Sequence, residues 1–375
     1  MIDVCLIGST GSIGVQTLEV LESFETHRVK ALSCGYNLTL LKQQIKKHKP
    51  KYAAALKRDT SLVKEFSDVN FFFGENGIEE MIDVCRADIL VNAASGSSGL
   101  KYSVKALGNV SRLCLANKET IVCGGYLFQH HLKKHNTELI PVDSEHSALF
   151  QLLEGGVAPE KVFITASGGA LRDYPLNKMA YASLDEVLKH PTWNMGKRIT
   201  IDSATMVNKG LELIEAHYLF GYGEKDIHTY INRSSLVHAG VIYSDGVIKI
   251  HAGKNDMKIP ISYSLSYPDR KKYVLNEVIQ NTEFKLEEID YKRYPSLKLA
   301  REILGDPVKQ IVFNASDEVA VGAFIKKEIN FGDIFQVISN TIEDVDMKKP
   351  TSFEDIMEID GIARIKASEE VKRSK

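Results

Sequence analysis

The sequence predicts an α/β protein with an N-terminal doubly wound parallel sheet, a central α+β domain and a small helical C-terminal domain. An apolar strand at residues 2–7 enters a glycine-rich turn and then a helix. Short apolar strands alternate with helices up to about residue 142, which is typical of a parallel sheet. From Leu297 onward, amphipathic helical segments dominate.

The composition excludes several classes of protein. The 375 residues are 44% hydrophobic and carry a net charge of −2, so we expect large cores and neither nucleic acid nor a membrane surface as partner. The five cysteines lie in the first third without a CxxC motif, which indicates a reduced, cytoplasmic protein. We expect no targeting peptide and no membrane span, because the chain starts in a strand and has no run of about 18 apolar residues.

The first strand and the turn after it predict a dinucleotide site of the Rossmann type. The turn reads GSTGSIG at 8–14 before a helix over 15–23, and such glycines let backbone N–H groups approach a pyrophosphate. Because the spacing is GxxGxxG rather than GxGxxG, a plain turn is the alternative. The next strand, 29–33, is followed by no carboxylate that could hold a ribose 2′-hydroxyl, which favours NADP over NAD.

Strands predicted at 52–56, 89–93, 112–115 and 137–142 complete the parallel sheet, and polar residues follow the last two. Ligands bind at the carboxyl ends of such strands. Asn117, Lys118 and Glu119 follow one strand; a charged helix start is the alternative. Asp143 and Glu145 follow the next, and in extended backbone they would share a side and face one ion. Solvated loop carboxylates are the alternative to that metal site.

Two later loops carry further candidate residues. The predicted strand at 161–165 leads to Ser167 and two glycines, which form either a nest of N–H donors for a phosphate or an ordinary turn. The loop 183–197 holds His190 beside Trp193, the only tryptophan of the chain. We expect this loop to be a lid over a site rather than part of a core.

The stretch 190–219 packs a loop, a short strand and a helix into thirty residues, and we expect Asp202 and Ser203 to cap the helix. Gly210 indicates close approach of another backbone or a ligand. A phosphate suits the N–H groups near Ser203, whereas Glu212 requires a cation, so we expect a metal. One arc of the helical wheel, separate from an apolar stripe, gathers the polar residues Thr205, Asn208, Lys209 and Glu212.

The second half of the chain predicts the domain organisation. Segments 235–243 and 246–250 form an antiparallel pair, and helices are predicted over 316–329 and 331–342. We expect a dinucleotide-binding domain at 1–143 and a catalytic and dimerisation domain at 144–266. A linker at 267–296 then leads to a helical domain at 297–375.

The motifs together resemble one enzyme family. In chain order they are GSTGSIG, NKET, PVDSEHSALFQ, ASGGALRD, HPTWNMGKRITIDSATMVNKGLELIEA and YPSLKLA. They are similar to those of the 1-deoxy-D-xylulose 5-phosphate reductoisomerase family, over nearly the whole chain. The resemblance implies an NADPH-dependent oxidoreductase that rearranges and reduces 1-deoxy-D-xylulose 5-phosphate to 2-C-methyl-D-erythritol 4-phosphate in non-mevalonate isoprenoid biosynthesis. It also implies Mg²⁺ or Mn²⁺ as cofactor and a homodimer.

The resemblance assigns roles residue by residue. The predicted metal ligands are Asp143, Glu145 and Glu212, which are also catalytic together with Lys118. The predicted substrate-binding residues are Lys118, Ser144, Glu145, Ser167, His190, Ser203, Asn208, Lys209 and Glu212. The predicted cofactor-binding residues are Thr10, Gly11, Ser12, Ile13, Gly35, Asn37, Asn117, Glu119 and Gly196. An all-oxygen ligand set suits a hard divalent cation, which can polarise neighbouring carbonyl and hydroxyl oxygens together.

The chain departs from the family pattern in two places, and two competing functions stay open. Tyr36 stands where members often carry a basic residue, and INRSS at 231–235 replaces the usual IHPQS. A related NADP-dependent oxidoreductase, such as a homoserine-type dehydrogenase, needs no metal-binding carboxylate trio beside a phosphate pocket. A non-catalytic nucleotide sensor has no use for Glu212 and Lys209 on one helix face.

Overall fold

The structure is a computed structural model that describes residues 1–192, 196–271 and 284–374. The chain forms two compact units. Unit 1 comprises Met1–Thr120, Phe128–Ser147 and the described part of Asp256–Asn276. Unit 2 comprises Ile121–Leu127, Ala148–Asn255 and the described part of Glu277–Lys375. The predicted domain boundaries remain predictions.

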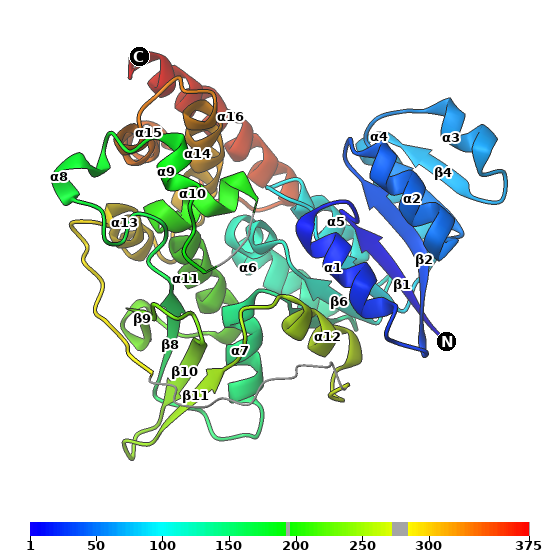
Figure 1. The fold of residues 1–375 in the computed structure, drawn as a ribbon, viewed down its shortest axis with the longest axis horizontal. Helices are drawn as coiled ribbons and strands as arrows, with labels where there is room; N and C mark the ends of the chain where they lie inside the picture. Colours follow the sequence, from blue (N-terminus) through cyan, green and yellow to red (C-terminus); the bar gives the residue numbers. More distant parts are fainter. Residues whose placement is uncertain (193–195, 272–283, 375) are drawn as a thin grey trace. The chain divides into compact units, whose positions relative to one another are not determined.

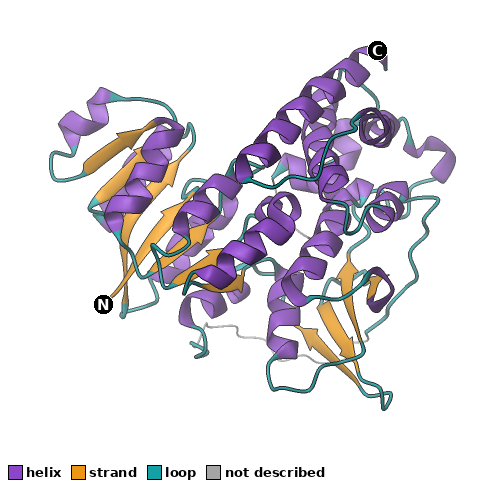
Figure 2. Ribbon diagram, turned by 180° about the vertical axis from the view of Figure 1, so that it is seen from behind, coloured by secondary structure: helices purple, strands orange, loops and turns teal. Residues whose placement is uncertain are grey.

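Unit 1 is built on a seven-stranded sheet in the order β4-β3-β2-β1-β5-β6-β7, and every neighbouring pair is parallel. Its strands are β1 Ile2–Ile7, β2 His27–Cys34, β3 Tyr52–Ala55, β4 Asn70–Phe73, β5 Ile89–Asn92, β6 Arg112–Leu115 and β7 Glu138–Pro141. Helices lie in front of this sheet in both opposite views (Figure 1, Figure 2). The doubly wound parallel sheet that the sequence predicts is therefore confirmed.

The helices that accompany these strands follow them in alternation, and two of them, α6 and α7, have residues in both units. They are α1 Ser12–Leu21, α2 Leu38–His48, α3 Thr60–Glu65, α4 Gly74–Cys85, α5 Gly99–Ala106, α6 Lys118–Lys134, α7 Ser144–Leu153 and, much later in sequence, α12 Lys258–Ser266. The core contains Val4 and Leu6 of β1, Leu32 of β2, and Ile261 and Leu265 of α12. Long apolar runs in β1 and β2 are buried because helices cover both faces of a parallel sheet.

Unit 2 contains a four-stranded mixed sheet in the order β11-β10-β8-β9. Its strands are β8 Lys161–Ala166, β9 Ile227–Ile231, β10 Val237–Ile242 and β11 Ile248–Ala252. β10 and β11 are antiparallel, as predicted, whereas β8 and β9 are parallel. Val162 and Ile164 of β8 share a core with Leu213 and Ala216. The predicted α+β character of this part is confirmed.

The remaining elements of unit 2 are mostly helices. They are α8 Leu176–Met179, α9 Leu184–Val187, α10 Lys197–Thr205, α11 Val207–Phe220, the 3₁₀ turn η1 Glu224–Asp226, α13 Pro295–Glu302, α14 Pro307–Ile325, α15 Phe331–Asp344 and α16 Phe353–Arg373. This confirms a helical C-terminal part. Among the described residues, no helix combines the length and the hydropathy that crossing a bilayer requires.

Three local predictions need correction. The segment predicted as a short strand before Asp202 is helical, and Asp202 and Ser203 lie inside α10 rather than at a helix start. The chain breaks at Met206, which has φ +62°, and α11 begins only at Val207. The helix predicted at 316–329 spans Pro307–Ile325, because Asp306 caps it with Pro307 as its first residue.

Candidate active site

The turn between β1 and α1 has the strand–turn–helix form that the glycines predict. Gly8 has φ +78°, and a Cβ there would lie 2.4 Å from the carbonyl oxygen of Ala93. A Cβ on Gly14 would lie 2.3 Å from the carbonyl oxygen of Gly8, so both positions require glycine. No described side chain caps α1, which leaves its first N–H groups facing the turn. This backbone fits a pyrophosphate, and the turn holds Thr10, Gly11, Ser12 and Ile13.

Asn117 and Glu119 brace a second turn of unit 1, the one after β5. Asn117 Nδ2 donates to the carbonyl oxygens of Ala94 and Gly96, both at 3.0 Å, and to Glu119 Oε2 at 2.7 Å. Glu119 Oε1 accepts from the Gly96 N–H at 3.1 Å. Asn117 also caps α6, so this segment starts a helix, and its role in ligand binding remains a prediction. Both side chains thus shape the turn at the carboxyl end of β5, where a parallel sheet binds its ligand.

The other predicted cofactor residues of unit 1 follow β2. Asn37 caps α2, with its Oδ1 accepting from the Leu40 N–H at 3.1 Å. Gly35 precedes it, and Tyr36 between them is 76% exposed. The side chain of Asn37 therefore has a structural role of its own at this strand end.

A charged cluster lies at the carboxyl end of β7. Lys118 Nζ is 2.8 Å from Asp143 Oδ2, and His146 Nδ1 is 2.9 Å from Asp143 Oδ1. Burial raises the pKa of Asp143, but Lys118 and His146 outweigh it and hold this pKa well below its usual range. Asp143 is therefore a carboxylate at neutral pH, which a metal ligand must be.

Glu145 joins Asp143 from the first turn of α7. One carboxylate oxygen of each residue lies within 4.8 Å of the other, so the pair offers hard oxygen ligands that fit one divalent cation. The Ser144 hydroxyl donates to Glu145 Oε2 at 2.5 Å. The expected extended backbone is wrong here, because α7 begins at Ser144 and the Glu145 N–H donates to Asp143 Oδ1 at 3.2 Å.

In unit 2, α11 gathers three of the predicted residues on one face. Lys209 Nζ forms an ion pair with Glu212 Oε2, and Asn208 Nδ2 donates to Glu212 Oε1 at 2.5 Å. Lys209 and Glu212 are only 3% and 2% exposed, so their charges compensate one another away from bulk water. Thr205 does not belong to this face: it ends α10, and its Oγ1 accepts from the Val207 N–H at 3.3 Å.

Gly210 has a packing reason that differs from the one expected. A Cβ there would lie 2.7 Å from Ala300 Cβ and 3.4 Å from Phe313 Cζ. These side chains belong to α13 and α14, so the close approach comes from neighbouring helices rather than from another backbone or a ligand.

The predicted phosphate residues Ser167, His190 and Ser203 meet at one imidazole ring in unit 2. His190 Nε2 lies 3.0 Å from Ser167 Oγ and 3.1 Å from Ser203 Oγ. Gly168 and Gly169 both have positive φ, and a Cβ on Gly169 would lie 2.5 Å from the Ser203 carbonyl oxygen. The Gly169 N–H donates to Ser167 Oγ at 3.1 Å, as in an ordinary serine turn, so the nest of N–H donors for a phosphate remains a prediction.

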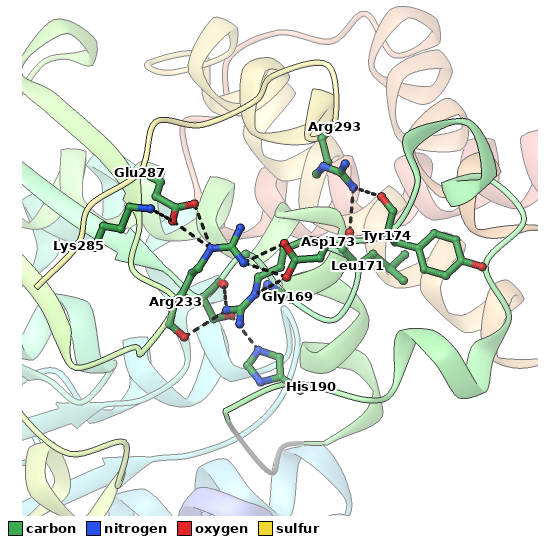
Figure 3. A network of polar contacts seen from close by, with 12 residues as sticks. Gly169, Leu171, Asp173, Tyr174, His190, Arg233, Lys285, Glu287 and Arg293 are labelled. Atoms are coloured by element: carbon green, nitrogen blue, oxygen red, sulfur yellow. Dashed lines mark hydrogen bonds and ion pairs between the residues drawn. The ribbon is translucent and has the colours of Figure 1, made fainter. Parts of the chain in front are cut away.

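Two arginines, Arg172 and Arg233, form hydrogen bonds next to this loop, and Figure 3 shows Arg233 between Asp173 and Glu287. Arg172 Nη1 donates to the carbonyl oxygens of Ser167 at 2.8 Å and Arg233 at 3.2 Å. Arg233 binds both Asp173 oxygens from Nη1, at 2.8 and 2.9 Å. Its Nε donates to both Glu287 oxygens at 3.0 and 3.1 Å. The run INRSS at 231–235, which departs from the family pattern, thus contributes Arg233 to the contacts around residues 167–173.

The environment of His190 predicts a specific pH effect on stability. Burial, and then the nearby Arg172 charge, lower its pKa from 6.5 to about 4. The unfolded chain therefore binds a proton that the folded chain does not, and stability falls as pH falls from 6.5 towards 4. We expect the melting temperature to fall less between pH 7 and pH 5 for His190→Gln than for the wild type, as measured by circular dichroism. Parallel melting curves for the two proteins would contradict this.

One predicted residue, Gly196, does not belong to the clusters described above, and one candidate, His146, was not predicted from the sequence. Gly196 is exposed and precedes α10. Of the lid predicted at 183–197, residues 193–195, which include Trp193, lie outside the described residues, and Leu184–Val187 forms the helix α9. Sequence reasoning missed His146, which pairs with Asp143. Its spacing of three residues from Asp143 was the available signal, since Asp143 immediately precedes α7 and residues three apart at a helix start lie on one side.

Comparisons with known proteins identify the family. Three family models match, described as 1-deoxy-D-xylulose 5-phosphate reductoisomerase at 4–125, its C-terminal domain at 139–220, and DXP reductoisomerase C-terminal domain at 252–366. A 1-deoxy-D-xylulose 5-phosphate reductoisomerase of Thermotoga maritima is 44% identical over 355 residues, which cover 94% of this chain and 93% of that protein. This chain belongs to the 1-deoxy-D-xylulose 5-phosphate reductoisomerase family. The resemblance seen in the sequence is confirmed.

Solved structures of reductoisomerases agree with this membership. A DOX-P reductoisomerase crystallised with NADPH, fosmidomycin and magnesium has a TM-score of 0.94 at 32% identity, over 99% of this chain and 98% of that chain. The reductoisomerase of Zymomonas mobilis in complex with NADPH has a TM-score of 0.91 at 34% identity, over 98% of each chain. The family fold thus covers nearly all of the chain.

Proposed function

We propose how the residues of this chain perform the reaction of their family, the NADPH- and divalent-metal-dependent conversion of 1-deoxy-D-xylulose 5-phosphate to 2-C-methyl-D-erythritol 4-phosphate. The observation that carries the proposal is the carboxylate pair of Asp143 and Glu145 beside Lys118. Relatives crystallised with NADPH and magnesium support both cofactors. Either Mg²⁺ or Mn²⁺ suits the oxygen ligands.

Asp143, Glu145 and Glu212 are the proposed metal ligands. A bound divalent cation supplies Lewis-acid polarisation of the substrate's carbonyl and hydroxyl oxygens. The low pKa of Asp143 keeps that residue ready as an anionic ligand. Lys118 pairs with Asp143 and would offer its ammonium to negative charge that develops on the substrate oxygens. Ser144 would hydrogen-bond the sugar hydroxyls.

The phosphate group of the substrate would be held in unit 2. The hydroxyls of Ser167 and Ser203 both lie against His190, and the glycines after Ser167 would add backbone N–H donors. Lys209 would supply a compact positive charge, and Asn208 an amide donor. Anchoring the phosphate away from the reacting carbons fixes the substrate in register, so binding energy is used for orientation.

The glycine turn of unit 1 would hold the pyrophosphate of NADPH, the hydride donor of the reduction. Thr10, Gly11, Ser12 and Ile13 lie at the start of α1, and Asn117 and Glu119 shape the neighbouring turn. Gly35, Asn37 and Gly196 complete the proposed cofactor contacts. The segment 183–197 is proposed as a lid that keeps water from the reactive aldehyde before its reduction.

The oligomeric state, the cellular location and the domain organisation of the protein are also part of the proposal. A homodimer is supported by the edge strand β11, where Ile248 and Ile250 are 59% and 40% exposed. A cytoplasmic location is supported by five buried free cysteines, since reduced thiols are typical of that compartment. The proposed organisation keeps domains at 1–143, 144–266 and 297–375 with a linker at 267–296.

Removal of the metal tests the proposed function. NADPH oxidation, followed at its nicotinamide absorbance with 1-deoxy-D-xylulose 5-phosphate as substrate, is expected to stop in excess EDTA and to return with Mg²⁺ or Mn²⁺. Aspartate semialdehyde, the aldehyde that a homoserine-type dehydrogenase would reduce, is expected to give no oxidation of NADPH. Oxidation that persists in EDTA, or that no divalent metal supports, would contradict the proposal.

A further inference from the structure

Two basic residues that follow β3 in unit 1, Lys57 and Arg58, have no role in the site described above. In the sheet, β3 pairs with β2 so that Ala55 lies opposite Cys34 at their carboxyl ends. The Leu56 N–H donates to the carbonyl oxygens of Cys34 and Gly35, both at 3.2 Å. The chain leaving β3 therefore runs against the turn that follows β2. Lys57 and Arg58 come next, and both are exposed.

Among the described residues, neither Lys57 nor Arg58 is paired with a neighbouring carboxylate, although, after the hydrogen bonds from Ser61, the charge of Lys57 helps to lower the pKa of Asp59. Asp59 caps α3, accepting from the N–H and the hydroxyl of Ser61 at 2.8 and 2.6 Å. Lys42 and Lys46 on α2 both pair with Glu65. Within the described part of the chain, by contrast, neither Lys57 nor Arg58 forms an ion pair. The chain just after the carboxyl end of β3 thus presents two positive charges to solvent.

The turn after β2 is where a Rossmann-type domain distinguishes its two nicotinamide cofactors. An acidic residue there would bind the ribose hydroxyls of NAD, and residues 34–37 contain none. They also contain no cation, because Tyr36 occupies the position and is 76% exposed. A 2′-phosphate bound at this turn needs a positive partner from elsewhere, and an arginine suits it because its guanidinium binds phosphate oxygens in pairs.

We propose that Lys57 and Arg58, delivered by β3 beside the turn after β2, bind the 2′-phosphate of NADPH and set the preference for NADPH over NADH. This inference rests on the proposed role of NADPH. Tyr36 then contributes an aromatic face rather than a charge. In this proposal, the preference for NADPH comes from residues that follow β3, and Lys57 and Arg58 supply the positive charge that Tyr36 lacks.

Direct binding of dinucleotides to the full-length protein tests the inference without turnover. Isothermal titration calorimetry with NADPH and with NADH compares the wild type, Lys57→Gln, Arg58→Gln and the double variant. The double variant is expected to bind NADPH at least about 10-fold more weakly and NADH unchanged, since the lost hydrogen bonds join charged groups. Lys51→Gln is the matched control, because Lys51 precedes the opposite end of β3.

The measured affinities distinguish a failure of the inference from a failure of the proposed function. Equal losses for both dinucleotides, or none for NADPH, in the double variant would overturn the inference. So would a wild type that binds NADPH and NADH with the same affinity. If the wild type prefers NADPH and the variants keep that preference, the inference fails while the proposed function stands. A wild type that binds neither dinucleotide would contradict the proposed function itself.

Discussion

Glu212→Gln is expected to lower kcat by about 10²–10³-fold at saturating Mg²⁺ while NADPH affinity stays at the wild-type value. Glutamine keeps the size of the side chain and an oxygen for Asn208, but it removes the negative charge that a metal ligand requires. NADPH binding is expected to persist, because the glycine turn belongs to the other unit. Steady-state kinetics over a Mg²⁺ titration measure the first effect, and calorimetry with NADPH measures the second.

The controls separate metal loss from unfolding. Removing the charge of Glu212 leaves the ammonium of Lys209 buried without its partner carboxylate, and breaking a buried ion pair costs about 3–5 kcal/mol. The melting temperature is therefore measured, and Glu145→Gln serves as a second variant in a more accessible position. Glu160→Gln, in an exposed position of unit 2, is expected to behave as the wild type. Full turnover by Glu212→Gln in saturating Mn²⁺ would remove Glu212 from the metal site.

Gly14→Ala is expected to abolish measurable NADPH binding and to destabilise the protein by about 1–3 kcal/mol. The added Cβ would lie 2.3 Å from the Gly8 carbonyl oxygen and 2.6 Å from Ser9 backbone atoms, which cannot rotate away as a side chain can. The turn that fits the pyrophosphate would have to open. Calorimetry with NADPH and denaturant unfolding measure the two effects.

Gly361→Ala is the matched control for this substitution. Gly361 lies inside α16, and a Cβ there meets nothing within 4 Å. Alanine at this site is expected to leave NADPH binding unchanged and to stabilise the protein by about 0.5–1 kcal/mol. If Gly14→Ala instead bound NADPH as the wild type does, the glycine turn would not be the pyrophosphate site.

Sequence patterns predicted most of the parallel sheet because its strands are continuous apolar runs. The strands at 2–7 and 112–115 were predicted with the bounds that the structure gives. β4 was not predicted, because its apolar run consists of only three phenylalanines and is shorter than the run by which a buried strand is recognised. The start of α14 was also missed, although Asp306 followed by Pro307 is a recognisable helix start.

The candidate site was predicted by residue type more successfully than by local backbone. Asn208, Lys209 and Glu212 share a helix face as their spacing indicates. The helix break at Met206 was not predictable from propensity, since a left-handed methionine is imposed by packing rather than by local preference. Which side chains face one ion depends on tertiary placement, and the roles of the proposed ligands remain predictions.

The most direct test of the central claim is a crystal structure of the protein with Mn²⁺, located by its anomalous scattering. The proposal predicts one Mn²⁺ with carboxylate oxygens of Asp143, Glu145 and Glu212 all at about 2.0–2.2 Å, the distance expected for a small divalent cation. An ion bound elsewhere, or an ion bound by Asp143 and Glu145 without Glu212, would contradict it.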